Sequence, residues 1–140
     1  MRTIAIYHVN KTKEPWLAEA ISLYRQRLRT TINLTYIPLK NDAQLLAAFH
    51  KEKTMLALDP QGKHLSSEGF AAELWRHFDT QGAHLAIAIG GPEGLPQEIR
   101  QKASLYSLSR LTFTHQIALL ILTEQIYRAV EIHKGTPYHK

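Results

Sequence analysis

The sequence of 140 residues contains no cysteine. Disulfide bonds, thiolate metal ligands and cysteine nucleophiles are therefore excluded, and the composition suits a reducing compartment. Long apolar runs are missing as well, since the longest, IALLIL at residues 117–122, is too short to cross a bilayer. The first residues, MRTIAIYHVNKTKEPW, have no apolar segment of the length that a signal peptide needs. We therefore expect a soluble, cytoplasmic protein with no membrane partner.

Acidic residues are scarce in the first part of the chain. Residues 1–58 hold nine Lys and Arg against four Asp and Glu, a balance of +5, whereas residues 59–140 hold eight of each, a balance of zero. Part of this excess is a cluster formed by Arg25, Arg27 and Arg29 beside Tyr24. Cations next to an aromatic side chain favour a polyanionic partner, most simply RNA. A solvated helix face that happens to be basic explains the same pattern.

The eight histidines do not form a metal-binding motif. His133 and His139 lie near each other, but no carboxylate or cysteine accompanies them at the spacing that zinc sites use. We expect no bound metal.

Apolar periodicity divides the chain into alternating strands and helices. Leu17, Ile21, Tyr24 and Leu28, for example, recur at helical spacing behind Pro15, a residue suited to the first turn of a helix. The alternation predicts one domain over residues 1–140, of α/β class, with a mostly parallel sheet and helices on both faces. The expected strands are residues 3–9, 32–39, 54–59, 83–89 and 105–113, the last leading into a loop, and the expected helices are residues 15–28, 41–52, 66–78, 95–103 and 115–133.

Three loops are candidates for a binding site, because ligands of such sheets bind beyond the carboxyl ends of the strands. One follows Asp59, where PQG predicts a turn, the second follows Ile89, and the third is residues 107–112. The second loop, in IAIGGPEGL (residues 87–95), is glycine-rich but is neither a dinucleotide fingerprint nor a P-loop.

The composition of the glycine-rich loop argues against a phosphate ligand. Pro92 removes a backbone donor, and Glu93 adds a negative charge. Glycines let the backbone approach a compact ligand closely, and a neutral or cationic ligand such as S-adenosylmethionine fits this loop better than an anion. A plain turn between a strand and a helix is the alternative interpretation.

The third loop, which lies within YSLSRLT (residues 106–112), offers hydroxyl groups between leucines. Ser107, Ser109 and Thr112 would orient an adenosine by hydrogen bonds, while the leucines would form apolar walls. No nucleophile-elbow motif surrounds either serine, so a serine nucleophile is not supported.

Four ordered motifs together resemble the bacterial 23S rRNA pseudouridine N3-methyltransferases of the SPOUT class. They are LALDPQGKHLSSEGFA, IAIGGPEGL, YSLSRLTFTHQ and EQIYRAVEIHKGTPYHK. The resemblance runs in register from about Met55 to the end of the chain and more loosely through the first helix. It implies S-adenosylmethionine as cofactor, a homodimer, a C-terminal trefoil knot, and methylation of N3 of a pseudouridine in 23S rRNA on the assembled ribosome.

The resemblance also implies roles for individual residues. Cofactor contacts fall on Leu58, Gly90, Ser107, Leu108, Ser109, Arg110, Leu111 and Thr112. The family's C-terminal ending matches Tyr138, His139 and Lys140, and its Tyr-Arg-Ala helix motif includes Arg128. In chemical terms, His139 is a candidate to accept the N3 proton, and Tyr138 would stack on the base or form a hydrogen bond with it. Arg128 would bind phosphate or stabilise the developing anion, and Lys140 would bind phosphate. A frayed tail and a surface ion pair between Arg128 and Glu124 are the alternatives.

The sequence departs from the family pattern near both ends. After the first strand the family commonly has Ala-Val-Gly-Lys, whereas this chain has His8, Val9, Asn10 and Lys11. In the last helix the family usually has an arginine three residues after its His-Gln pair, whereas this chain has Leu119. The contact that this arginine makes is therefore in question here.

Two other functions remain compatible with the residues. One is a non-catalytic module that binds RNA or the ribosome, and the other is a methyltransferase of the same class acting on another nucleotide.

For the dimer, an apolar contact would come from the last helix. Its expected contact residues are Ile117, Leu120, Ile121 and Ile126.

Overall fold

The computed structural model describes residues 1–9 and 14–140. Five strands alternate with five helices along this part of the chain. In order they are β1 (Arg2–Val9), α1 (Pro15–Leu28), β2 (Ile32–Leu39), α2 (Asp42–Lys51), β3 (Met55–His64), α3 (Ser67–Gln81), β4 (His84–Ile89), α4 (Gln97–Lys102), β5 (Ser104–Ser107) and α5 (His115–Lys134).

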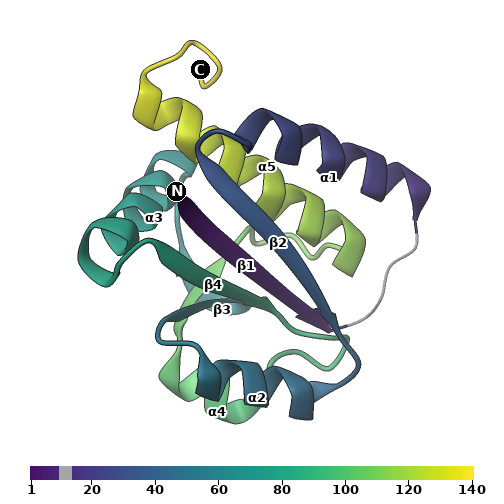
Figure 1. The fold of residues 1–140 in the computed structure, drawn as a ribbon. Coiled ribbons are helices and arrows are strands. Elements are labelled where there is room, and N and C mark those ends of the chain that lie inside the picture. Colours follow the sequence, from purple (N-terminus) through teal and green to yellow (C-terminus); the bar gives the residue numbers. More distant parts are fainter. Residues whose placement is uncertain (10–13) are drawn as a thin grey trace.

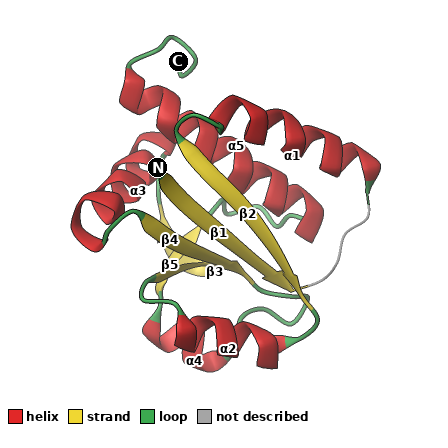
Figure 2. Ribbon diagram, viewed as in Figure 1, coloured by secondary structure: helices red, strands yellow, loops and turns green. Residues whose placement is uncertain are grey.

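The strands form one sheet in the order β2-β1-β4-β3-β5, and every paired strand runs parallel to its neighbour. Helices α1, α3 and α5 cover one face of the sheet, and α2 and α4 cover the other (Figures 1 and 2). The predicted α/β class, with helices on both faces of a parallel sheet, is confirmed. The C-terminal knot stays a prediction.

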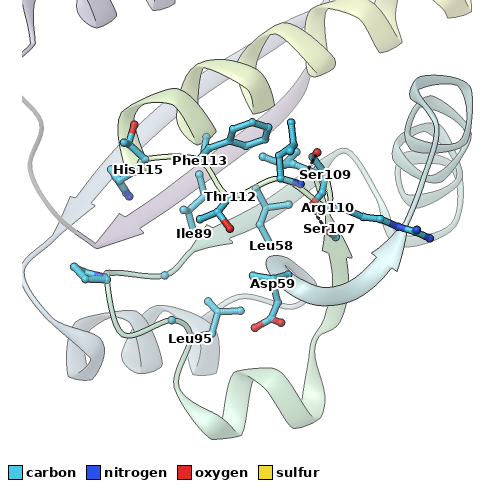
Figure 3. Close-up of a pocket in the computed structure, with 18 of the residues that line it drawn as sticks. Leu58, Asp59, Ile89, Leu95, Ser107, Ser109, Arg110, Thr112, Phe113 and His115 are labelled. Carbon is cyan, nitrogen blue, oxygen red and sulfur yellow. Dashed lines mark hydrogen bonds between the residues drawn. The ribbon is translucent and has the colours of Figure 1, made fainter.

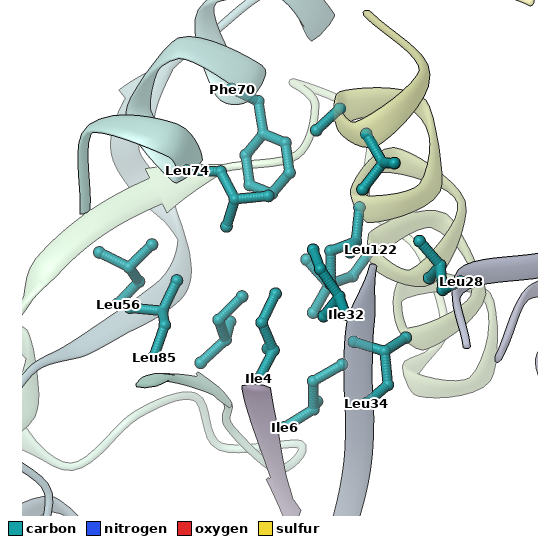
Figure 4. Close-up of a cluster of buried hydrophobic side chains, with 14 of the residues drawn as sticks. Ile4, Ile6, Leu28, Ile32, Leu34, Leu56, Phe70, Leu74, Leu85 and Leu122 are labelled. Carbon is teal, nitrogen blue, oxygen red and sulfur yellow. The ribbon is translucent and has the colours of Figure 1, made fainter. Parts of the chain in front are cut away.

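Each buried strand contributes to both faces, because successive side chains of a strand point to opposite sides. In β1, Ile4 and Ile6 pack in the larger core below α1, α3 and α5, whereas Ala5, Tyr7 and Val9 pack below α2 and α4. Figure 4 shows the larger core, in which Leu74 and Leu122 meet the strands from α3 and α5. This two-sided burial explains why the strands are almost uniformly apolar.

Local sequence signals set several helix ends. The Asn41 side chain accepts a hydrogen bond from the Gln44 amide at 3.0 Å, and the Ser66 hydroxyl accepts one from the Gly69 amide at 3.0 Å. Gly135 ends α5 in the left-handed region, with φ of 73°. Caps of this kind satisfy the backbone groups that a helix end leaves unpaired.

Two strands differ from the sequence-based prediction. β3 does not end at Asp59 but runs to His64, because Leu58 and Lys63 both pair with Tyr106 of β5 and residues 59–62 bulge out between them. Gly62 permits this, because a Cβ atom there would lie 2.7 Å from the backbone of Leu105 in β5. β5 is shorter than expected and ends at Ser107, so the following residues form a loop. In the described part of the chain no helix is long and apolar enough to cross a membrane.

Candidate active site

A cavity of about 620 Å³ lies at the carboxyl ends of β3, β4 and β5. The irregular part of β3 and the loops that follow β4 and β5 form its walls, and the first turn of α5 closes one side (Figure 3). All eight residues expected to contact a cofactor line this cavity: Leu58, Gly90, Ser107, Leu108, Ser109, Arg110, Leu111 and Thr112. A volume of this size is typical of pockets for small molecules. Their role as cofactor contacts stays a prediction.

The glycine-rich loop is a tight turn held by its own backbone. The Gly94 amide donates to the Gly91 carbonyl at 2.9 Å, and Gly94 has φ of 84°. A Cβ atom on Gly90 would lie 2.7 Å from the carbonyl carbon of Gly94. Gly90 is therefore required by the packing of the loop against itself, in addition to any role at the ligand.

The loop after β5 uses its serines internally. The Ser107 hydroxyl donates to the Ser109 carbonyl at 2.9 Å, and the Ser109 hydroxyl accepts from the Leu111 amide at 3.0 Å. These bonds set the course of the loop, so the two hydroxyls act first on the protein backbone. A ligand that bonds to the Ser107 or Ser109 hydroxyl would share that hydroxyl with the backbone of the loop.

His115, the first residue of α5, lines the cavity and was not singled out from the sequence. Its Nε2 atom lies 3.2 Å from Nδ1 of His8 on β1. Burial lowers the pKa of His115, so its imidazole is predominantly neutral at pH 7. Its Nδ1 atom is buried without a hydrogen-bond partner among the described residues. Only the sheet and α5 together create this pair, and no spacing in the sequence indicates it.

The C-terminal tail packs against α5 and α3. Arg128 contacts Glu124 at 2.7 Å, the ion pair that the alternative interpretation expected. Arg128 also donates to Nδ1 of His139 at 2.9 Å, because a guanidinium has no acceptor. The His139 Nε2 atom, which then carries the ring proton, lies 3.2 Å from a carboxylate oxygen of Glu68. Arg128 and Glu68 thus contact the two ring nitrogens of His139 and fix the orientation of its ring.

Aromatic contacts complete the docking of the tail. The Tyr138 ring packs edge-on against Tyr127, with 4.8 Å between centroids, and the Arg128 guanidinium lies 4.9 Å from the centre of the Tyr138 ring. Burial raises the pKa of the Tyr138 hydroxyl, so it remains protonated at neutral pH. Lys140, the last residue, is exposed.

The tail and the cavity lie at opposite ends of α5. His115 at the start of this 20-residue helix lines the cavity, whereas the tail follows its last residue. At 1.5 Å per residue the helix separates the two by about 30 Å, and Figure 1 shows the C-terminus far from the carboxyl ends of the strands. The expected catalytic residues and the expected cofactor residues of one chain therefore do not form one site.

The three arginines of the basic cluster are exposed on and just after α1. Arg27 lies above the rings of Tyr24 and Tyr127, at 5.7 and 5.6 Å, and Arg25 lies above Tyr36 at 5.8 Å. The basic cluster and the tail thus share Tyr127 as a common neighbour.

The residues that depart from the family pattern lie close to His115. His8 is buried beside it, and Leu119 is buried one turn further along α5. Asn10 and Lys11 lie outside the described residues.

Of the apolar residues expected at a dimer contact, Ile126 is fully buried within the subunit, which contradicts that role, whereas Ile117 is exposed.

Comparison with known proteins identifies the family. A family model described as "Predicted SPOUT methyltransferase" matches residues 1–139. A protein of Protochlamydia amoebophila (strain UWE25) named "Ribosomal RNA large subunit methyltransferase H" is 47% identical over 140 residues, covering 100% of both chains. The chain belongs to the SPOUT methyltransferase family. The resemblance drawn from the four motifs is confirmed.

Further relatives agree with this membership. A protein with the same name from Prochlorococcus marinus is 35% identical over 140 residues, covering 96% of this chain and 94% of that one. Among solved structures, a probable methylase family protein from Haemophilus influenzae Rd KW20 superimposes with a TM-score of 0.61 at 10% identity, covering 98% of this chain and 70% of the other. At that identity the likeness concerns the fold alone.

Proposed function

We propose that this SPOUT methyltransferase is a homodimer that methylates N3 of a pseudouridine in 23S rRNA on the assembled ribosome. The main support is the cavity, because the three loops expected to bind S-adenosylmethionine meet there in a chain of this family. The names of the relatives support large-subunit ribosomal RNA as the substrate. The pseudouridine and its N3 atom rest on the resemblance of the motifs.

The residues of the cavity fit this cofactor. Leu58, Ile89, Leu95 and Leu108 offer apolar walls for an adenine ring, and the glycine-rich loop brings backbone groups close to the ligand. S-adenosylmethionine supplies a methyl group carried on a positively charged sulfur. Pro92 has no backbone N–H and the Gly94 amide is engaged by the Gly91 carbonyl, so this turn has fewer donors to offer a phosphate.

The chain's own residues would position the acceptor and remove its proton. N3 of pseudouridine is a weakly acidic imide, so a nearby acceptor or cation must stabilise its loss of a proton. Within the cavity, neutral His115 would accept this proton at its Nε2 atom, which lies 3.2 Å from Nδ1 of His8. Tyr138, His139 and Arg128 would hold the nucleotide from the acceptor side. Because about 30 Å of helix separates them from their own cavity, we propose that they serve the cavity of the partner subunit.

A substitution that fills the cavity tests cofactor binding. Gly90 is unsuitable, because a side chain there would collide with Gly94. Ala118 lines the cavity from α5, and Ala118→Phe places a ring inside it without changing the backbone. We expect at least about tenfold weaker binding of S-adenosylmethionine in calorimetry, with an unchanged melting temperature. Ala47→Phe, the same change at an exposed position of α2 outside the cavity lining, is the matched control and should bind normally.

The same proteins should then be tested on ribosomes from a strain that lacks this methyltransferase. Wild-type protein and Ala47→Phe should add one methyl group to pseudouridine, located by mass spectrometry of rRNA fragments, and Ala118→Phe should not. Methylation at a different nucleotide would favour the other methyltransferase function. Ribosome binding without any binding of S-adenosylmethionine would favour the non-catalytic module.

A further inference from the structure

Asp59 is the one charged side chain that is buried in the lining of the cavity, among the described residues. It is 7% exposed. Its Oδ1 atom accepts a hydrogen bond from the Gln61 amide at 2.8 Å, and it forms no ion pair with any described residue. Figure 3 shows its carboxylate beside Leu95, on the side of the cavity opposite Phe113.

The other ionisable groups of the lining leave this charge uncompensated. His64 and Arg110 are exposed, and the Arg110 side chain extends away from the cavity in Figure 3. His115 is neutral at pH 7 because burial lowers its pKa. Glu93, the carboxylate that suggested a cationic ligand in the sequence, is exposed and does not line the cavity.

A buried carboxylate without a cationic partner is costly, because the protein replaces water poorly around a charge. A ligand that brings a positive charge to this wall offsets that cost, whereas a phosphate meets repulsion. The negative charge is thus placed where it can distinguish ligands by their charge.

We propose that Asp59 determines the specificity of the cavity by selecting adenosine ligands that carry a positive charge. The inference rests on the proposed function and adds to it the residue that recognises the cationic part of S-adenosylmethionine. Neutral adenosine compounds would bind through the same apolar walls but would gain nothing from this carboxylate.

The isosteric variant Asp59→Asn tests the proposal, because its amide oxygen can still accept from Gln61. Affinities for S-adenosylmethionine and for neutral 5′-methylthioadenosine are measured by calorimetry. We expect S-adenosylmethionine to bind on the order of tenfold more weakly, because the attraction between the carboxylate and the ligand's positive charge is lost, and 5′-methylthioadenosine to bind as it does to wild type. Glu93→Gln removes a carboxylate outside the cavity and should change neither affinity.

The outcomes separate this inference from the proposed function. If wild type fails to bind S-adenosylmethionine, the proposed function is wrong. If wild type binds it and Asp59→Asn weakens both ligands equally, Asp59 contacts the shared adenosine, and selection by charge is overturned. Unchanged binding of both ligands overturns it as well. Asp59→Ser, which also accepts from Gln61, provides the same comparison if the asparagine variant does not fold.

Discussion

His77 in α3 is a histidine whose polar ring is buried without hydrogen bonds to the described residues. It is 6% exposed, and neither ring nitrogen has a hydrogen-bond partner among the described residues. Burial is the largest cause that lowers its pKa, with a smaller contribution from nearby Arg76. The folded protein therefore holds His77 neutral at pH values where the unfolded chain binds a proton.

This residue predicts a dependence of stability on pH. Above the ordinary histidine pKa of about 6.5, His77 is neutral in both the folded and the unfolded chain, so it causes no change of stability with pH. As the pH falls below that value, the unfolded chain takes up a proton that the folded protein does not, so stability decreases until the lowered pKa is passed. His77→Leu should be about 1 kcal/mol more stable than wild type at pH 8, because an unsatisfied polar group is removed.

The advantage of His77→Leu should grow as the pH is lowered from 7 to 5. Urea unfolding of wild type and variant at several pH values measures the difference directly. A difference that stays constant with pH would show that His77 titrates alike in both states.

At the scale of elements, α1 combines an inner face that packs and an outer face that is basic. Leu17 and Leu28 are buried, whereas Arg25, Arg27 and Arg29 are exposed. Through Tyr127, this outer face is continuous with the tail that follows α5. Cations interleaved with aromatic rings suit unpaired RNA bases and their phosphates. We propose that α1 and the tail bind the rRNA as one surface.

Replacing Arg25, Arg27 and Arg29 by glutamine should therefore weaken ribosome binding and reduce its dependence on salt concentration. The slope of log affinity against log salt should fall by roughly two to three units, one for each lost phosphate contact. Lys51, Arg100 and Lys102, which lie on the helices of the opposite face, provide a control triple with the same change in charge. Equal effects from both triples, measured by filter binding at several salt concentrations, would show a general charge effect without a defined surface.

At the scale of the whole molecule, the cavity and the tail lie at opposite ends of α5. If the cavity and the tail act on the same nucleotide, as we propose, a complete site requires two subunits, each supplying one half. Trp16, Leu23 and Ile117 are exposed apolar residues on α1 and α5, where a partner subunit would cover them. Sedimentation of a monomer at working concentrations would contradict this arrangement.

Mixing two inactive variants tests the shared site. Ala118→Phe has a blocked cavity and an intact tail, and a truncation that removes Tyr138, His139 and Lys140 has an intact cavity. Each alone should be inactive, although the truncated protein should still bind S-adenosylmethionine. After subunit exchange, mixed dimers should restore roughly a quarter of wild-type activity, because half of the dimers would contain one intact site of two. No recovery in dimers shown to be mixed would mean that the tail does not act across the interface.

Most elements of the fold could be predicted from the sequence because their signals are local. The apolar stripe of α1, the serine before α3 and the glycine after α5 each act within a few residues of the structure they set. The extension of β3 could not be predicted in this way. Asp59, Pro60 and Gly62 are typical of a turn and lie in a bulge, but Lys63 and His64 pair again with β5, more than forty residues away in the chain, and so extend the strand.

The sequence by itself determined the elements, the family and the segments that line the cavity, because parallel strands bring their carboxyl ends to one edge of the sheet. Only the tertiary structure decided which charges and imidazoles enter that cavity. It placed Asp59 in the wall and Glu93 outside, joined His8 to His115 from opposite ends of the chain, and put the tail at the far end of α5. The physical reason is that side-chain burial and long-range pairing depend on how the elements pack, and local spacing carries no information about that.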